Sequence, residues 1–110
     1  MSNICSERND LPEERIVREM GCSRSEFMRW LPGATRQAVL HSSRHGEQDL
    51  HRIVTPGGTV VITTVIMAPR RIALMTLPVL QVIFHFIDME APAQADFMHY
   101  FDLYTRRGGG

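Results

Sequence analysis

Two long stretches of the chain contain no Asp, Glu or Arg, and they constrain the fold more than any other feature. They run from Ile53 to Pro69 and from Ile72 to Ile87. A membrane-spanning helix needs about 20 predominantly apolar residues in succession. The first stretch is broken by Pro-Gly-Gly at 56–58 and holds four threonines, and the second is interrupted by Pro78. We therefore expect no membrane span, and the many β-branched residues predict strands.

Proline and glycine divide this half of the chain into predicted strands. We expect strands at 50–55, 59–67, 71–77 and 79–88, with a turn at 55–58 and a break at Ala68-Pro69. Pro78 marks either a turn or a kink, because proline cannot donate to a β-ladder. One face of the last strand carries alternating apolar residues, namely Leu80, Val82, Phe84 and Phe86.

Helices are predicted before the sheet region. Leu11–Met20 is expected to be a helix, because proline and two glutamates suit its first turn, and a strand over Arg15–Met20 is the alternative. Ser23 or Ser25 can cap a second helix that ends at Pro32-Gly33. A further short helix is expected at Thr35–His41, followed by a polar loop at Ser42–Asp49.

A helix from about Pro92 to Thr105 is expected to close the fold. Its apolar stripe should pack on the sheet, and it consists of Ala93, Phe97, Tyr100, Phe101 and Tyr104. The predicted fold class is therefore α+β: N-terminal short helices, then an antiparallel three- to four-stranded sheet, closed by a C-terminal amphipathic helix packed on one sheet face.

The chain is expected to hold one domain at residues 11–107, after a flexible lead at 1–10 and before a glycine tail at 108–110. We expect one sheet face to be only half-covered, which favours a homodimer or a protein partner through the sheet. Its residues are Thr63, Val65, Met67, Ala73, Met75 and Ile83.

Charge and cysteine content narrow the classes of function. The net charge is zero, with 12 basic and 12 acidic residues, so no global field attracts nucleic acid or an anionic membrane. All basic residues are arginine, which excludes a Schiff-base lysine and a phosphate-loop lysine. Two cysteines make no disulfide scaffold, and the polar first ten residues lack a signal-peptide core, so we expect a cytoplasmic protein.

Residues 13–32 resemble a helix-turn-helix. Gly21 stands where that motif has its turn glycine, and apolar residues stand where the motif buries them. The resemblance implies that Arg24 and Arg29, with Ser23 and Ser25, would face DNA. Val17 departs from the pattern, because the motif prefers alanine there for close packing of its helices.

The segment from residue 41 to 51 holds the densest set of possible metal ligands. His41 and His45 would share one face of a helix, and Glu47, Asp49 or His51 could complete the metal site. The alternative is a solvated loop followed by the start of a strand.

No coherent catalytic set and no cofactor-binding loop stand out in the sequence. We therefore expect a small non-catalytic binding or accessory subunit and assign no cofactor. The alternatives are a helix-turn-helix DNA-binding protein and a small metal-dependent enzyme that uses His41, His45 and His51.

Overall fold

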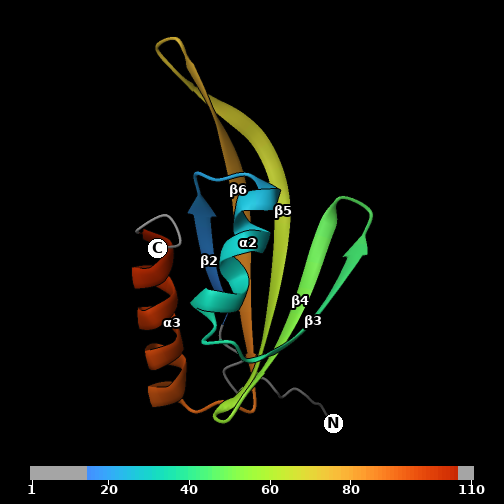
Figure 1. The fold of residues 1–110 in the computed structure, drawn as a ribbon, viewed down its shortest axis with the longest axis vertical. Helices are drawn as coiled ribbons and strands as arrows, with labels where there is room; N and C mark the ends of the chain where they lie inside the picture. Colours follow the sequence, from blue (N-terminus) through green and yellow to red (C-terminus); the bar gives the residue numbers. More distant parts are fainter. Residues whose placement is uncertain (1–14, 107–110) are drawn as a thin grey trace, which may run out of the picture.

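The computed structural model describes residues 15–106, which form five strands and two helices (Figure 1). In chain order these are β2 (Arg15–Met20), α2 (Arg24–Ala34), β3 (Val39–His45), β4 (Gln48–Thr55), β5 (Gly58–Ile72), β6 (Met75–Ile87) and α3 (Ala91–Arg106). The prediction of an α+β fold with an antiparallel sheet and a C-terminal helix is confirmed. The flexible lead and the glycine tail lie outside the described residues.

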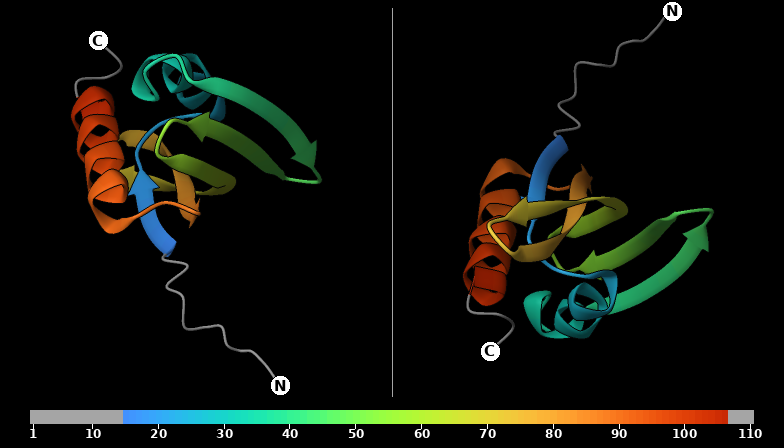
Figure 2. Two further views of the ribbon diagram at one scale, coloured as in Figure 1. Left: turned by 90° about the horizontal axis from the view of Figure 1, so that it is seen from below. Right: turned by 90° about the horizontal axis from the view of Figure 1, so that it is seen from above.

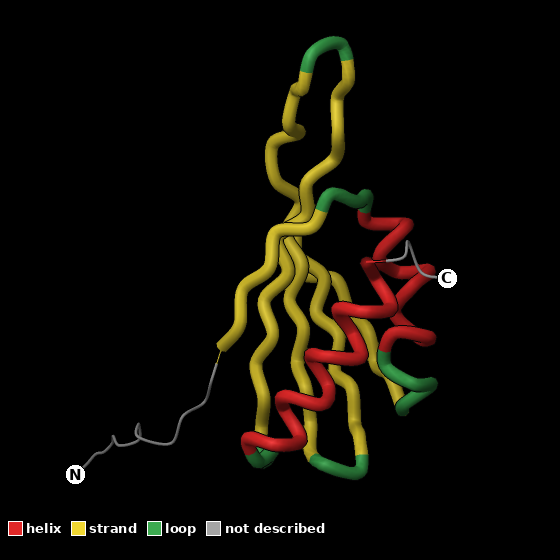
Figure 3. The backbone as a smooth tube through the Cα atoms, turned by 90° about the vertical axis from the view of Figure 1, so that its left-hand side faces the viewer, coloured by secondary structure: helices red, strands yellow, loops and turns green. Residues whose placement is uncertain are grey.

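All five strands form one antiparallel sheet in the order β2-β6-β5-β4-β3. Consecutive hairpins account for β3 to β6, and β2 joins the other edge by pairing with the last strand. Both helices lie against the same face of this sheet (Figure 3). Seen along the long axis of the molecule, the β3–β4 hairpin extends away from α3 (Figure 2). With five strands, the sheet is larger than the three- to four-stranded sheet predicted from the sequence.

The additional strand at the first edge corrects the predicted helix over Leu11–Met20. Its described part, Arg15–Met20, is strand β2, which was the alternative interpretation of the sequence. Exposed and half-buried residues alternate along it, and Ile16 and Met20 pack against the core. All six residues of β2 pair with residues of β6, from Leu80 to His85. This tertiary pairing outweighs the local helical spacing of the apolar residues.

The strand at the opposite edge corrects the short helix predicted at Thr35–His41 and the loop predicted at Ser42–Asp49. Helix α2 ends at Ala34, and β3 and β4 then form a hairpin around Gly46 and Glu47. Gly46 has a φ of 66°, which glycine adopts without steric cost. The polar residues here belong to a strand because β4 supplies a complete antiparallel ladder from Val39 to His45.

A long hairpin replaces the three separate strands predicted at 59–67, 71–77 and 79–88. Strand β5 continues to Ile72, and the turn lies at Ala73 and Leu74. Pro69 does not end the strand but lies in an irregular part of the ladder between Met67 and Arg70, opposite Pro78. Prolines are tolerated there because the ladder is already interrupted. We call residues 67–79 the arm, which projects beyond the rest of the sheet (Figure 1).

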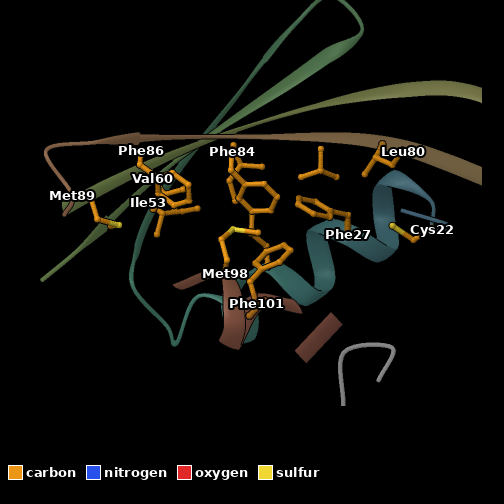
Figure 4. Packing of buried hydrophobic residues seen from close by; sticks show 14 residues of the cluster. Cys22, Phe27, Ile53, Val60, Leu80, Phe84, Phe86, Met89, Met98 and Phe101 are labelled. Carbon is orange, nitrogen blue, oxygen red and sulfur yellow. The ribbon is translucent and has the colours of Figure 1, made fainter. Parts of the chain in front are cut away.

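The core lies between the sheet and the two helices (Figure 4). Phe84 of β6 meets Phe101 of α3 edge-on, with ring centroids 4.9 Å apart, and Phe27 of α2 lies 6.2 Å from Phe101. Edge-on aromatic pairs add to the stabilisation from burial alone. Four residues of the predicted stripe of α3 belong to this core or pack against it, namely Ala93, Phe97, Phe101 and Tyr104, and buried Met98 joins them. Tyr100 instead lies under the guanidinium of Arg36. Within residues 15–106 no helix is long and apolar enough to cross a membrane.

Candidate interaction surface

The sheet face opposite the helices, which we call the outer face, is not covered by any described element. The burial pattern of β4 assigns its residues to the two faces: Asp49, His51 and Ile53 are buried toward the helices, whereas Leu50 and Arg52 point the other way. The strand register extends this assignment to every strand, because paired residues in an antiparallel sheet share a face. A solvated outer face normally carries polar residues at alternate positions.

The centre of the outer face is instead largely apolar. A row across four strands consists of Val17, Ile83, Thr63 and Leu50. The neighbouring rows have aliphatic residues at their middle positions, Val61 on one side and Val65 on the other. We define the outer-face patch as Val17, Leu50, Val61, Thr63, Val65 and Ile83. Val17 is 56% exposed although it is a large apolar residue.

The predicted dimer face is therefore divided between two places in the structure. Thr63, Val65 and Ile83 lie in the outer-face patch, whereas Ala73 and Met75 lie at the tip of the arm. Met67, at the base of the arm, is 39% exposed. At the tip, Leu74 is fully exposed to solvent, and Ile72 and Met75 are 52% and 60% exposed.

Charged residues flank the apolar centre at the β2 edge. Arg15 stands one row away from Val17 on one side, and Glu19 stands one row away on the other. Glu19 also forms an exposed ion pair with Arg70, with 2.5 Å between Oε1 and Nη2. The β2 edge of the patch thus presents a positive and a negative group on either side of an aliphatic residue.

The described part of the segment that resembles a helix-turn-helix, residues 15–32, does not form that motif. Its first helix would need residues 15–20, which are strand β2. The predicted cap of the second helix is confirmed: Ser23 accepts a hydrogen bond from the Glu26 backbone at 3.2 Å, in a capping box. Pro32 lies inside α2 rather than ending it.

Arg24 is engaged with the protein itself. Its guanidinium donates two hydrogen bonds to the carboxylate of Asp49, one from Nε and one of 3.2 Å from Nη2. Arg44 approaches the same carboxylate from β3 at 3.3 Å. Asp49 is 4% exposed, and the Arg24 hydrogen bond holds its pKa below the usual value. Arg29 is exposed on α2.

The three histidines predicted to hold a metal do not converge. His41 and His45 lie on the outer face, because their partners in the register are Arg52 and Gln48. His51 points to the opposite face and is fully buried. In the described part of the chain, no group of three or more His, Cys, Asp or Glu is arranged to hold a metal ion. The prediction assumed that His41 and His45 lie on a helix, and strand alternation separates them from His51 instead.

His51 belongs to a polar contact beneath α2. Its Nδ1 lies 2.7 Å from the hydroxyl of Ser42, and its Nε2 has no hydrogen-bond partner within the described residues. Burial lowers the pKa of His51, which keeps the imidazole neutral. Nothing in the sequence marked this histidine as different from its two neighbours, since the distinction depends on which sheet face α2 covers.

Comparison with known proteins yields no relative from which a role could be inferred. No protein-family model matches the chain. No curated protein and no solved structure matches it either. The surface itself therefore carries the functional interpretation.

Proposed function

We propose that this protein is a non-catalytic binding or accessory subunit that acts as a homodimer, with the outer-face patch as the contact between the two copies. The observation that carries the proposal is the uncovered apolar row across four strands. An apolar patch of this kind on a soluble domain is typical of an interaction site.

A second copy fits the patch by symmetry and by charge. A two-fold axis along the row of Val17 and Ile83 would place the outer faces of two sheets against each other. The same axis interchanges the two rows beside it. Arg15 of one copy would then face Glu19 of the second copy, and the reverse pair would form at the symmetric position.

The size of the outer face supports a stable dimer. Five strands spaced by about 4.8 Å give a width of about 24 Å, and the ladder from residue 59 to 67 is about 30 Å long. The projected area is therefore about 700 Å² in each copy. Stable interfaces bury about 800 Å² per partner, so the face is close to the required size.

The proposal is tested by analytical ultracentrifugation of the wild type and of Val17→Asp. Val17 is exposed on an edge strand, so the substitution should leave the monomer folded but place a carboxylate in the dimer interface. We expect a dimer for the wild type and a dissociation constant at least tenfold higher for Val17→Asp. The matched control is Leu103→Asp, an exposed position on α3 outside the patch, which should remain dimeric.

Charge exchange tests the orientation of the two copies. Glu19→Arg should weaken the dimer, because Arg15 would face a like charge. The double variant Arg15→Glu with Glu19→Arg should restore it, because the pairing is reciprocal. A wild type that stays monomeric at hundreds of micromolar, or a double variant that is weaker than Glu19→Arg, would overturn the proposal.

A further inference from the structure

A cavity of about 470 Å³ lies on the helix side of the molecule, away from the outer-face patch. It is enclosed by the end of α2 and the turn after it, by the β4–β5 turn, and by the first half of α3. Its volume is in the range of small-molecule sites. Its walls are mostly apolar and include Ala34, Ala38, Met89, Ala93, Phe97 and the ring of Tyr100.

The polar end of the cavity is built from an unusual piece of backbone. Arg36 and Gln37 have φ values of 57° and 59°, the left-handed conformation that glycine adopts most easily. Hydrogen bonds maintain it: the Arg36 amide donates to the Gly33 carbonyl at 3.1 Å, and the Gln37 amide donates to the Pro32 carbonyl at 2.8 Å. Glycine would satisfy the backbone here, so an arginine at this position points to a use for its side chain.

The Arg36 side chain is directed at the cavity wall. Its guanidinium lies over the ring of Tyr100, 4.3 Å from the ring centroid, and its Nη1 is 3.3 Å from a carboxylate oxygen of Asp96. All three residues line the cavity. A guanidinium has five N–H donors, so the contact with Asp96 leaves others for a ligand. The side chain of Asp96 is 64% exposed, and water therefore screens its repulsion of a bound anion.

From this arrangement we infer that the cavity binds a small organic acid, with its apolar body against Phe97 and Ala93 and its carboxylate on Arg36. Apolar walls would supply most of the affinity, and the planar guanidinium would recognise the planar carboxylate. The inference is independent of the dimer, because neither Arg36 nor the apolar walls named above belong to the outer-face patch.

Isothermal titration calorimetry with naphthalene-2-carboxylate and its neutral analogue naphthalene-2-carboxamide tests the inference. We expect one site per chain and a carboxylate that binds about two- to fivefold more tightly than the amide, the range for a half-exposed charge pair. Arg36→Gln should abolish this preference. Ala93→Phe should fill the cavity and abolish binding of both compounds, whereas Leu103→Phe, elsewhere on α3, should bind as the wild type does.

Amide chemical-shift mapping on the wild type gives a readout that does not depend on any variant folding. The shifts should concentrate at the residues around the cavity, namely 34–39, 54–57, 89 and 93–100. The inference is overturned if neither compound binds, if the shifts fall elsewhere, or if Arg36→Gln keeps the preference for the carboxylate. Binding that persists in monomeric Val17→Asp would confirm that the cavity and the dimer are separate properties.

Discussion

Replacing Asp49 by asparagine should destabilise the fold far more than the loss of any other single carboxylate among the described residues. The Asp49 side chain is 5% exposed and accepts hydrogen bonds from Arg24 of α2 and Arg44 of β3. It therefore ties the start of α2 to the β3–β4 hairpin. The substitution keeps the size of the side chain, removes its charge and replaces one acceptor oxygen by an NH2 donor, so a single neutral oxygen is left for the two arginines.

The magnitude follows from the number of contacts and from the exposure of each partner. A hydrogen bond to a charged group contributes about 1.5–3 kcal/mol, and breaking a buried ion pair costs about 3–5 kcal/mol. The side chains of Arg24 and Arg44 are 39% and 45% exposed, so water compensates part of their loss. We therefore expect Asp49→Asn to lower the free energy of unfolding by about 3 kcal/mol, near the lower bound for a buried pair.

The effect should also depend on pH in a defined direction. The folded-state pKa of Asp49 is lowered, mainly by its hydrogen bond with Arg24. A lowered carboxylate pKa contributes stability that is complete above the unfolded-state value, about pH 4, and is lost as the pH falls through the folded-state value. The difference between wild type and Asp49→Asn should thus be constant from pH 7 to about pH 4 and shrink below that.

Urea denaturation followed by circular dichroism at several pH values measures both quantities. Asp96→Asn is the matched control, because its ion pair with Arg36 is mostly exposed and should contribute less than about 1 kcal/mol. If Asp49→Asn loses no more stability than Asp96→Asn at pH 7, the contacts of Asp49 do not stabilise the fold in the way described.

Three further predictions concern positions packed between the elements. A Cβ on Gly33 would lie 2.1 Å from the Tyr104 hydroxyl. In the wild type, Gly33→Ala should therefore lower the free energy of unfolding by about 1–3 kcal/mol. In a Tyr104→Ala background the same substitution should be neutral or stabilising, as a double-mutant cycle by urea unfolding would show. Burial raises the pKa of Cys22 to about 11. In a Cys5→Ser background this thiol should therefore not react with Ellman's reagent at pH 8 until the protein is unfolded. Rapid reaction of the native protein would contradict its burial. The pKa of His51 is lowered, chiefly by burial, so its stabilising contribution is complete above about pH 6.5 and is lost as the pH falls through the folded-state value. Stability measured between pH 7 and 5 should therefore fall less in His51→Phe than in the wild type, and equal slopes would refute the assignment.

The accuracy of the sequence predictions depended on how local their causes are. The cap at Ser23 and the apolar stripe of α3 follow from spacing within one turn or one helix, and the structure confirms the cap and four of the five residues of the stripe. Strand β2 could not be predicted reliably, because its conformation is decided by pairing with β6, which lies 60 to 70 residues later in the chain. The two extra edge strands changed the sheet from three or four strands to five for the same reason.

The candidate sites were still harder to predict, because they depend on which side chains share a face. The sequence placed His41, His45 and His51 in one cluster, and the sheet divides them between two faces. No sequence pattern distinguishes Arg36 from the other arginines. Its role in the cavity depends on its left-handed backbone and on its contact with the ring of Tyr100, which lies 64 residues later.

By itself the sequence determined that the second half of the chain forms strands, because its long uncharged stretches are rich in β-branched residues and interrupted by turn residues. It also determined that the fold closes with an amphipathic helix. Only the tertiary structure decided that Arg15–Met20 is a strand, that the centre of one sheet face is left largely apolar and uncovered, and that a cavity forms beside Arg36. Strand pairing, face sharing and cavities arise from contacts between distant segments, and local propensity contains no information about those contacts.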